Sequence, residues 1–121
     1  MSAQRLHQSF IDAWHGLKYV FNTEQNFRIQ VIASLFALGA SIYFPLHAWE
    51  VVLIILLIVM VLTMELLNTA LEKFSDLLKP RLHHYVGVIK DIMAGAVLLT
   101  SLAALLVGLI IFLPHFIGLF K

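Results

Sequence analysis

The sequence contains no cysteine, and only 12% of its 121 residues are charged. Without cysteine the chain has neither a disulfide framework nor a thiolate metal site. Soluble domains typically carry about 25% charged residues, so the low charge argues against a water-soluble enzyme. The net charge of +1 gives no electrostatic footprint for nucleic acid. Instead 61% of the residues are hydrophobic and the mean hydropathy is +0.94, which predicts a small integral membrane protein.

Three hydrophobic stretches are long enough to cross a bilayer, which takes roughly 20 residues of helix. They cover about residues 26–45, 49–79 and 88–114. Because the second stretch holds neither glycine nor proline, we expect one helix of about 30 residues, roughly 45 Å long at 1.5 Å per residue. Its later part should extend into the cytosol and end at Pro80. The sequence therefore predicts an all-α membrane protein with a single membrane domain over residues 1–121.

Residues about 3–22 show a different pattern, with apolar side chains along one side of a helix. At about 100° per residue, seven apolar side chains fall within an arc of about 120°. They are Leu6, Phe10, Ala13, Trp14, Leu17, Val20 and Phe21. Such an amphipathic helix suits the membrane surface, with Trp14 at the level of the lipid headgroups. A helix that packs on the protein itself would show the same pattern, and the two interpretations are not exclusive.

The basic residues predict the orientation in the membrane. The connection between the first and second stretches holds neither lysine nor arginine, whereas basic residues precede the first stretch and lie between the second and third. These residues are Arg5, Lys18 and Arg28, then Lys73, Lys79, Arg81 and Lys90. By the positive-inside tendency, the N-terminus and the 73–91 connection are expected on the cytoplasmic side of the cell's inner (cytoplasmic) membrane.

Four polar residues share one face of the second predicted helix. Glu65, Asn68, Glu72 and Asp76 stand at offsets 0, 3, 7 and 11, which places them within an arc of about 80°. Glu65 lies about 22 Å along the helix from Glu50, so it should still be inside the hydrocarbon layer near its cytoplasmic edge. Ionisable residues at such a depth are expensive and by default indicate function.

Further charged residues are expected at the same level, because all three predicted spans pass the cytoplasmic interface there. Glu24 stands just before the first span, and Lys90 and Asp91 just before the third. So many carboxylates would repel one another unless cations share the site. Carboxylate oxygens without sulfur suit Mg²⁺, which usually accompanies phosphates, and Lys90 would then neutralise phosphate charge.

Each residue taken alone also has a purely structural interpretation. A single glutamate at the end of a span is usually an interfacial anchor or an inter-helix hydrogen bond. Asp76 could form an ordinary ion pair with Lys73 or Lys79 on its own helix. Asn68 could simply join two helices. It is the collective arrangement that favours a functional site.

Two segments carry a resemblance to a known family. ELLNTALEKFSD, from Glu65 to Asp76, is followed by VIKDIMAGAVLL, from Val88 to Leu99. The pair resembles the prokaryotic diacylglycerol kinase and undecaprenol kinase family, and TEQNFRI and AWHGLKY upstream support the likeness. The resemblance implies a homotrimer of subunits with three transmembrane helices and one surface helix. It also implies transfer of the γ-phosphate of ATP to a lipid hydroxyl, at active sites built between subunits.

The same resemblance assigns roles to residues of this chain. It places the catalytic base on Glu65 and the Mg²⁺-binding carboxylates on Glu24 and Glu72. Nucleotide contacts fall on Lys90 and Asp91, with Arg5 and the Arg81 to His83 stretch as further candidates. Asn68, one turn beyond Glu65, is expected to orient that carboxylate or the substrate hydroxyl, and Asp76 is expected beside the nucleotide as part of the same cluster.

The lipid substrate and two other protein classes stay open at this point. The Ile-Met-Ala-Gly-Ala stretch after Asp91 favours undecaprenol, with diacylglycerol as the alternative, and Gln30 departs from the histidine often found in the undecaprenol branch. A small proton-coupled multidrug transporter is a more remote possibility, but its carboxylate should lie at the membrane midplane. A non-catalytic scaffold that binds partners through the 73–91 connection would leave the polar stripe unexplained.

Overall fold

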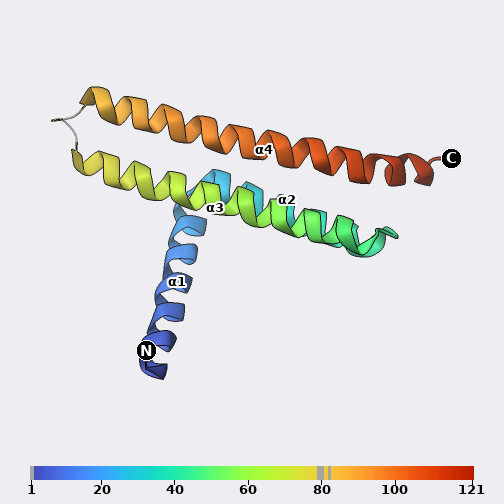
Figure 1. Ribbon diagram of the computed structural model, residues 1–121, viewed down its shortest axis with the longest axis horizontal. Coiled ribbons are helices and arrows are strands. Elements are labelled where there is room, and N and C mark those ends of the chain that lie inside the picture. Colours follow the sequence, from blue (N-terminus) through green and yellow to red (C-terminus); the bar gives the residue numbers. More distant parts are fainter. Residues whose placement is uncertain (1, 79–80, 82) are drawn as a thin grey trace.

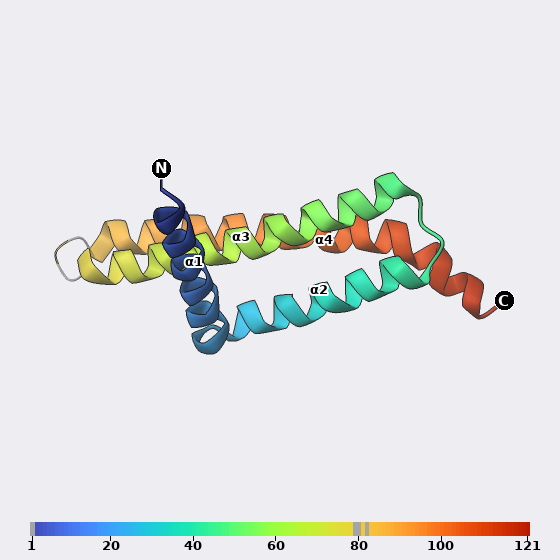
Figure 2. The ribbon, with the colours of Figure 1, turned by 90° about the horizontal axis from the view of Figure 1, so that it is seen from below.

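The computed structural model describes residues 2–78, 81 and 83–121, and these form four helices. They are α1 (Ala3–Thr23), α2 (Gln25–Tyr43), α3 (Ala48–Leu78) and α4 (His83–Leu119). The two long helices α3 and α4 run side by side in opposite directions, and α1 stands roughly at a right angle to them (Figure 1). In the view from below, α2 runs alongside the beginning of α3 and the later part of α4 (Figure 2).

Helix α3 is continuous over 31 residues, about 46 Å, because no glycine or proline interrupts it. Its first turn is closed by Glu50, whose Oε1 accepts hydrogen bonds from the backbone N–H of His47 at 2.9 Å and from His47 Nδ1 at 3.0 Å. The backbone bond is the returning half of a capping box, which satisfies a donor that the helix would leave unpaired. Lys79 and Pro80, where the helix was expected to end, lie outside the described residues.

Helix α4 is longer at both ends than the predicted span over about residues 88–114. It begins at His83, passes through Pro114 and ends at Leu119. Proline removes one backbone hydrogen bond from a helix. Contacts of Phe44 with side chains on both sides of Pro114 hold the last turns in place: the ring of Phe44 lies 6.4 Å from that of Phe112 and 5.0 Å from that of Phe116, between centroids.

Both α3 and α4 are long and apolar enough to cross a membrane. Helix α2 is a weaker case, because its first turn carries Gln25, Asn26 and Arg28. Its uncharged remainder, Ile29 to Tyr43, is about 22 Å long at 1.5 Å per residue, whereas the hydrocarbon core is about 30 Å thick. The third transmembrane span therefore stays a prediction.

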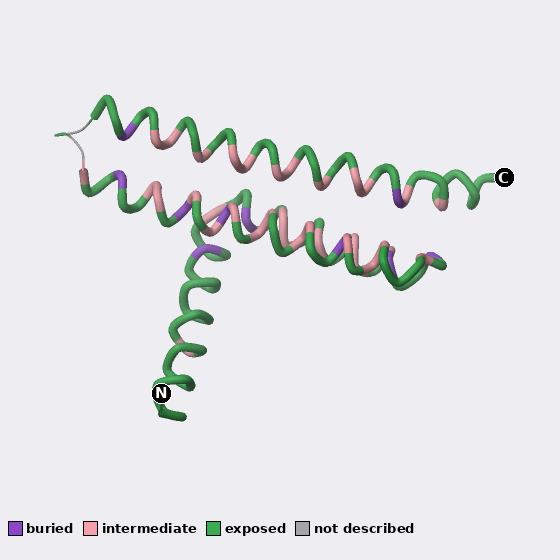
Figure 3. Tube along the Cα trace, in the orientation of Figure 1, coloured by how far each residue is buried: buried purple, intermediate pink, exposed green. Residues whose placement is uncertain are grey.

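Helix α3 is the centre of the fold, since it contacts each of the other three helices. Figure 3 shows buried and intermediate positions along α3 where it runs beside α4. Helix α1 is different: Val20 near its end is buried, but Phe10 and Trp14 on its apolar face are 69% and 65% exposed. The fold thus leaves the apolar face of α1 uncovered within the chain. A helix that lies on the membrane surface, as predicted, needs such an uncovered face.

The corner between α1 and α2 is held by one side chain. Arg28 Nη1 donates hydrogen bonds to the backbone carbonyl oxygens of Phe21 at 2.9 Å and Asn22 at 3.0 Å. These carbonyls belong to the last turn of α1, which also carries the negative end of the helix dipole. Arg28 therefore fixes the angle at which Glu24, at the corner itself, faces the rest of the protein.

Replacing Arg28 by alanine should loosen this corner. Loss of the two hydrogen bonds, at a site open to solvent, should cost about 1 kcal/mol locally, which corresponds to roughly fivefold faster exchange. Hydrogen–deuterium exchange of the amides of residues 21–25 in detergent micelles measures this. As a control, Lys18→Ala removes one positive charge from α1 and should leave exchange at the corner unchanged. Equal exchange in wild type and Arg28→Ala would contradict the role of Arg28.

Candidate functional site

Glu65 is the most unusual residue of the fold, because it carries a carboxylate and is only 2% exposed. It lies on the side of α3 that α2 covers. One turn further on, Thr69 is buried as well and its Oγ1 donates a hydrogen bond to the Glu65 carbonyl oxygen at 3.0 Å. A buried charge is tolerated only with hydrogen bonds or opposite charges around it, so the surroundings of this carboxylate decide what it can do.

The partner of Glu65 comes from α2. The side-chain amide of Gln30 lies close enough to the Glu65 carboxyl group to act on it as a hydrogen-bond donor. Two oxygens are nevertheless left over: Glu65 Oε2 and Gln30 Oε1 are buried and have no hydrogen-bond partner among the described residues. Gln30 was not among the residues predicted for the site, although a glutamine inside the uncharged stretch of α2 was a signal for it.

Two more carboxylates act on Glu65. Glu72, two turns further along α3, and Glu24, at the corner before α2, both lie near enough for their negative charges to repel that of Glu65. Asn68 Nδ2 donates to Glu72 Oε1 at 3.4 Å. Asn68 was expected to orient Glu65 or the substrate hydroxyl, and that role stays a prediction. The hydrogen bond that its amide makes here joins it to Glu72, four residues further along the same helix face.

Asp76 and Lys90 form an ion pair between α3 and α4, with 3.0 Å between Asp76 Oδ1 and Lys90 Nζ. This pair cross-links the two long helices; the expected local pairing of Asp76 with Lys73 or Lys79 stays a prediction, and Lys79 lies outside the described residues. Asp76 is 54% and Lys90 32% exposed, so the pair stands in water rather than in the apolar core. Asp91, next to Lys90, is also exposed.

The remaining expected nucleotide contacts are not brought to this cluster within the chain. Arg5 lies in the first turns of α1, at the end of that helix that points away from α3 (Figure 1). Arg81 and His83 are exposed at the connection between α3 and α4, and Leu82 between them lies outside the described residues.

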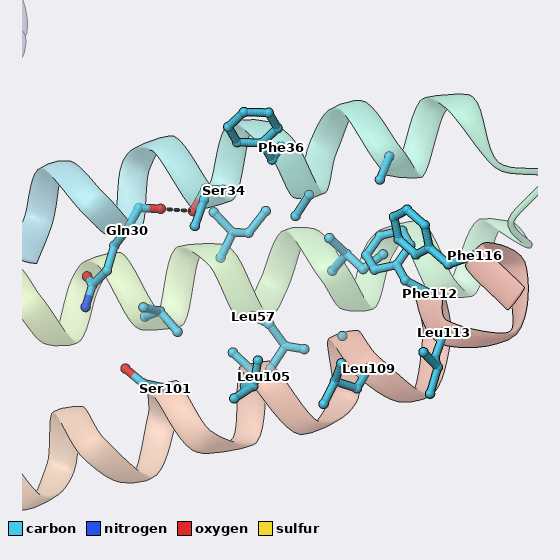
Figure 4. Close-up of a pocket in the computed structure, with 18 residues that line it drawn as sticks. Gln30, Ser34, Phe36, Leu57, Ser101, Leu105, Leu109, Phe112, Leu113 and Phe116 are labelled. Carbon is cyan, nitrogen blue, oxygen red and sulfur yellow. Dashed lines mark hydrogen bonds between the residues drawn. The ribbon is translucent and has the colours of Figure 1, made fainter.

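An apolar groove of about 490 Å³ begins beside the cluster and is lined by α2, α3 and α4. Gln30 stands at one end, where its side chain extends from α2 over α3, and Phe112 and Phe116 stand at the other (Figure 4). Its floor on α3 includes Val61, and Glu65 follows by one helical turn on the same face. Besides Gln30, the polar residues that line the groove are Ser34 and Ser101.

Comparison with known proteins decides the family. The family model described as prokaryotic diacylglycerol kinase matches residues 12–112. A diacylglycerol kinase of Synechocystis sp. is 40% identical over 97% of this chain and 67% of its own length. An undecaprenol kinase of Bacillus subtilis is 36% identical over 91% of this chain and 89% of its own length, and a diacylglycerol kinase of Escherichia coli is 30% identical over 86% and 85%.

The chain belongs to the prokaryotic diacylglycerol kinase family. The resemblance seen in the sequence is thereby confirmed, and this membrane protein is a lipid kinase that uses ATP. Family membership sets aside the transporter and the scaffold. The relatives differ in the lipid that their names carry, so they leave the substrate of this kinase between two alternatives.

The carboxylates of the kinase fit Mg²⁺ in the way that nucleotide enzymes use it. Within residues 2–78, 81 and 83–121, no three histidine, aspartate or glutamate side chains gather closely enough to hold a metal ion by themselves. Mg²⁺ in kinases is usually bound by one or two carboxylates together with phosphate oxygens. Glu24 and Glu72 can therefore suffice once the nucleotide supplies the other ligands.

Removing one charge from the cluster should stabilise the kinase when divalent cations are absent. In Glu72→Gln, repulsion with Glu65 and Glu24 disappears while an oxygen stays available to Asn68, so we expect a free energy of unfolding about 0.5–1 kcal/mol higher. Thermal unfolding in detergent with a chelator measures it. Glu50→Gln, the matched change at the other end of α3, should give no gain, and a Glu72→Gln variant no more stable than wild type would show that the cluster is not strained.

Proposed function

We propose that this kinase transfers the γ-phosphate of ATP to the hydroxyl of undecaprenol, on the cytoplasmic side of the membrane. We further propose that it works as a homotrimer with three membrane spans in each chain, α2 being the first. The observation that carries the proposal is the position of Glu65. This buried carboxylate, with one unpartnered oxygen, stands at the head of an apolar groove.

Glu65 has the geometry of a general base for an alcohol held in the groove. A lipid hydroxyl placed there donates its hydrogen bond to Glu65 Oε2. The hydroxyl oxygen then forms a bond to the γ-phosphorus, the bond from that phosphorus to the β–γ bridging oxygen breaks, and the hydroxyl proton passes to Glu65. ADP leaves with the bridging oxygen. Phosphoryl transfer of this kind depends on positioning and charge stabilisation more than on covalent chemistry.

The remaining polar residues form the proposed nucleotide side of the site. Glu24 and Glu72 would hold Mg²⁺ on the β- and γ-phosphates, where bound Mg²⁺ supplies neutralisation of phosphate charge. Lys90 would neutralise phosphate oxygens, and its ion pair with Asp76 ties it to α3 beyond Glu72. Asp91 would accept hydrogen bonds from the ribose. Arg5 can contribute to this side of the site only from a neighbouring subunit, because α1 of the same chain points away.

The apolar lining of the groove favours a polyprenol over a diacylglycerol. A polyprenol has one hydroxyl and a hydrocarbon chain, so it needs no polar partner beyond Glu65. A diacylglycerol also brings two ester carbonyls, which need hydrogen-bond donors. The Ser34 hydroxyl in the groove already donates to the backbone carbonyl oxygen of Gln30 at 2.7 Å. Diacylglycerol stays the second candidate, because the Synechocystis relative at 40% identity is a diacylglycerol kinase.

The proposed function is tested by offering diacylglycerol and undecaprenol side by side with γ-labelled ATP in detergent. We expect label in both lipid extracts to depend on Glu65, and the faster transfer with undecaprenol. In Glu65→Gln the base is lost, so kcat should fall at least roughly 100-fold, within the range typical of a general base. Glu50→Gln on the same helix should keep kcat near that of wild type. Full activity in Glu65→Gln would remove the assignment of the base.

The metal role of Glu72 has a separate signature. Glu72→Ala removes one of two protein ligands, so the Mg²⁺ concentration that gives half-maximal activity should rise by about tenfold or more, while the apparent KM for the lipid changes little. A titration with Mg²⁺ at fixed, saturating lipid measures this shift. Glu50→Ala is the control, and an unchanged Mg²⁺ dependence in Glu72→Ala would assign Glu72 a different role.

A further inference from the structure

Gln30 links three features of the site that are otherwise unconnected. It comes from α2, acts as a hydrogen-bond donor to the Glu65 carboxyl group of α3, and lines the end of the apolar groove. Its backbone is held by the helix, and its carbonyl oxygen accepts from Ser34 Oγ at 2.7 Å (Figure 4). The side chain is thus the direct contact between the groove and the buried carboxylate.

Glu65 and Gln30 each keep one buried side-chain oxygen that has no hydrogen-bond partner among the described residues. On Glu65 this oxygen is Oε2, which is therefore available to a ligand. On Gln30 it is Oε1, and the amide can donate only through Nε2. A buried acceptor left without a partner costs about 1–3 kcal/mol. Such a cost is typical of a site that waits for a hydrogen-bond donor from a ligand.

A neutral donor suits this position for an electrostatic reason. Glu24 and Glu72 already act on Glu65 with negative charge. An acidic partner would add to that repulsion, and a basic partner would form an ion pair that weakens Glu65 as a base. An amide N–H holds one oxygen of the carboxylate without changing the charge of the cluster.

On this basis, and resting on the proposed function, we propose that Gln30 is a positioning residue for the phosphoryl transfer. Its amide N–H donates to the Glu65 carboxylate and thereby aims the unpartnered Oε2 at the head of the groove, where the substrate hydroxyl binds. Gln30 acts on the reaction through Glu65 and not by binding the hydrocarbon chain.

The test compares Gln30→Met, which keeps the length of the side chain but has no N–H, with wild type in the two-lipid assay. We expect kcat to fall roughly 10- to 100-fold, as for a catalytic group displaced by about 1 Å, with KM for ATP and for the lipid changed less than about twofold. Gln30→His keeps an N–H donor and should restore kcat to within about fivefold of wild type. Gln25→Met makes the same substitution at an exposed site on α2 and should have no effect.

A double variant separates positioning from a structural role. If Gln30 acts through Glu65, then Gln30→Met combined with Glu65→Gln should be no slower than Glu65→Gln alone, because the effects of residues that act as a unit are not additive. Additive losses, or a rise in the lipid KM with kcat unchanged, would overturn the proposal. If circular dichroism shows that Gln30→Met does not fold, Gln30→Ala carries the same expectations. A wild type that phosphorylates neither lipid would instead overturn the proposed function.

Discussion

Burying the carboxylate of Glu65 among apolar helices costs several kcal/mol unless hydrogen bonds or opposite charges offset the loss of water. The fold provides one neutral donor, Gln30, and surrounds the carboxylate with further negative charge from Glu24 and Glu72. This arrangement does not serve stability. Under the proposed function, it keeps the proton acceptor away from water and leaves a place for cations where the lipid meets the nucleotide.

The polar stripe of α3 connects two phases. Glu72 and Asp76 lie about 10 Å and 16 Å beyond Glu65 along the helix axis, and exposure rises in the same direction, from the buried Glu65 to the half-exposed Asp76. A lipid alcohol can therefore stay in the apolar groove while the charged nucleotide stays in water. Contact between the two is needed only at the level of Glu65. A continuous helix is well suited to this task, because it holds all these groups at fixed spacing.

At the other end of the molecule, the structure closes the groove by packing. Phe44, which is buried, contacts the rings of Phe112, His115 and Phe116. The same contacts carry α4 past Pro114, and the His47–Glu50 pair begins α3 beside them. The groove thus has a polar end and an aromatic end. A ligand with one hydroxyl and a hydrocarbon chain matches this polarity.

The length of the hydrophobic stretches and the periodicity of residues about 3–22 predicted the four helices. Helical spacing also predicted the shared face of Glu65, Asn68, Glu72 and Asp76, because it dictates which side chains are neighbours. It could not determine partners on other helices, since these depend on crossing angles and on the rotation of each helix about its axis. Only the tertiary structure paired Gln30 with Glu65 and Asp76 with Lys90, formed the groove, and directed α1 with Arg5 away from the cluster. The end of α4 at Leu119 also lay beyond local rules, because contacts with Phe44 outweigh the helix-breaking tendency of Pro114.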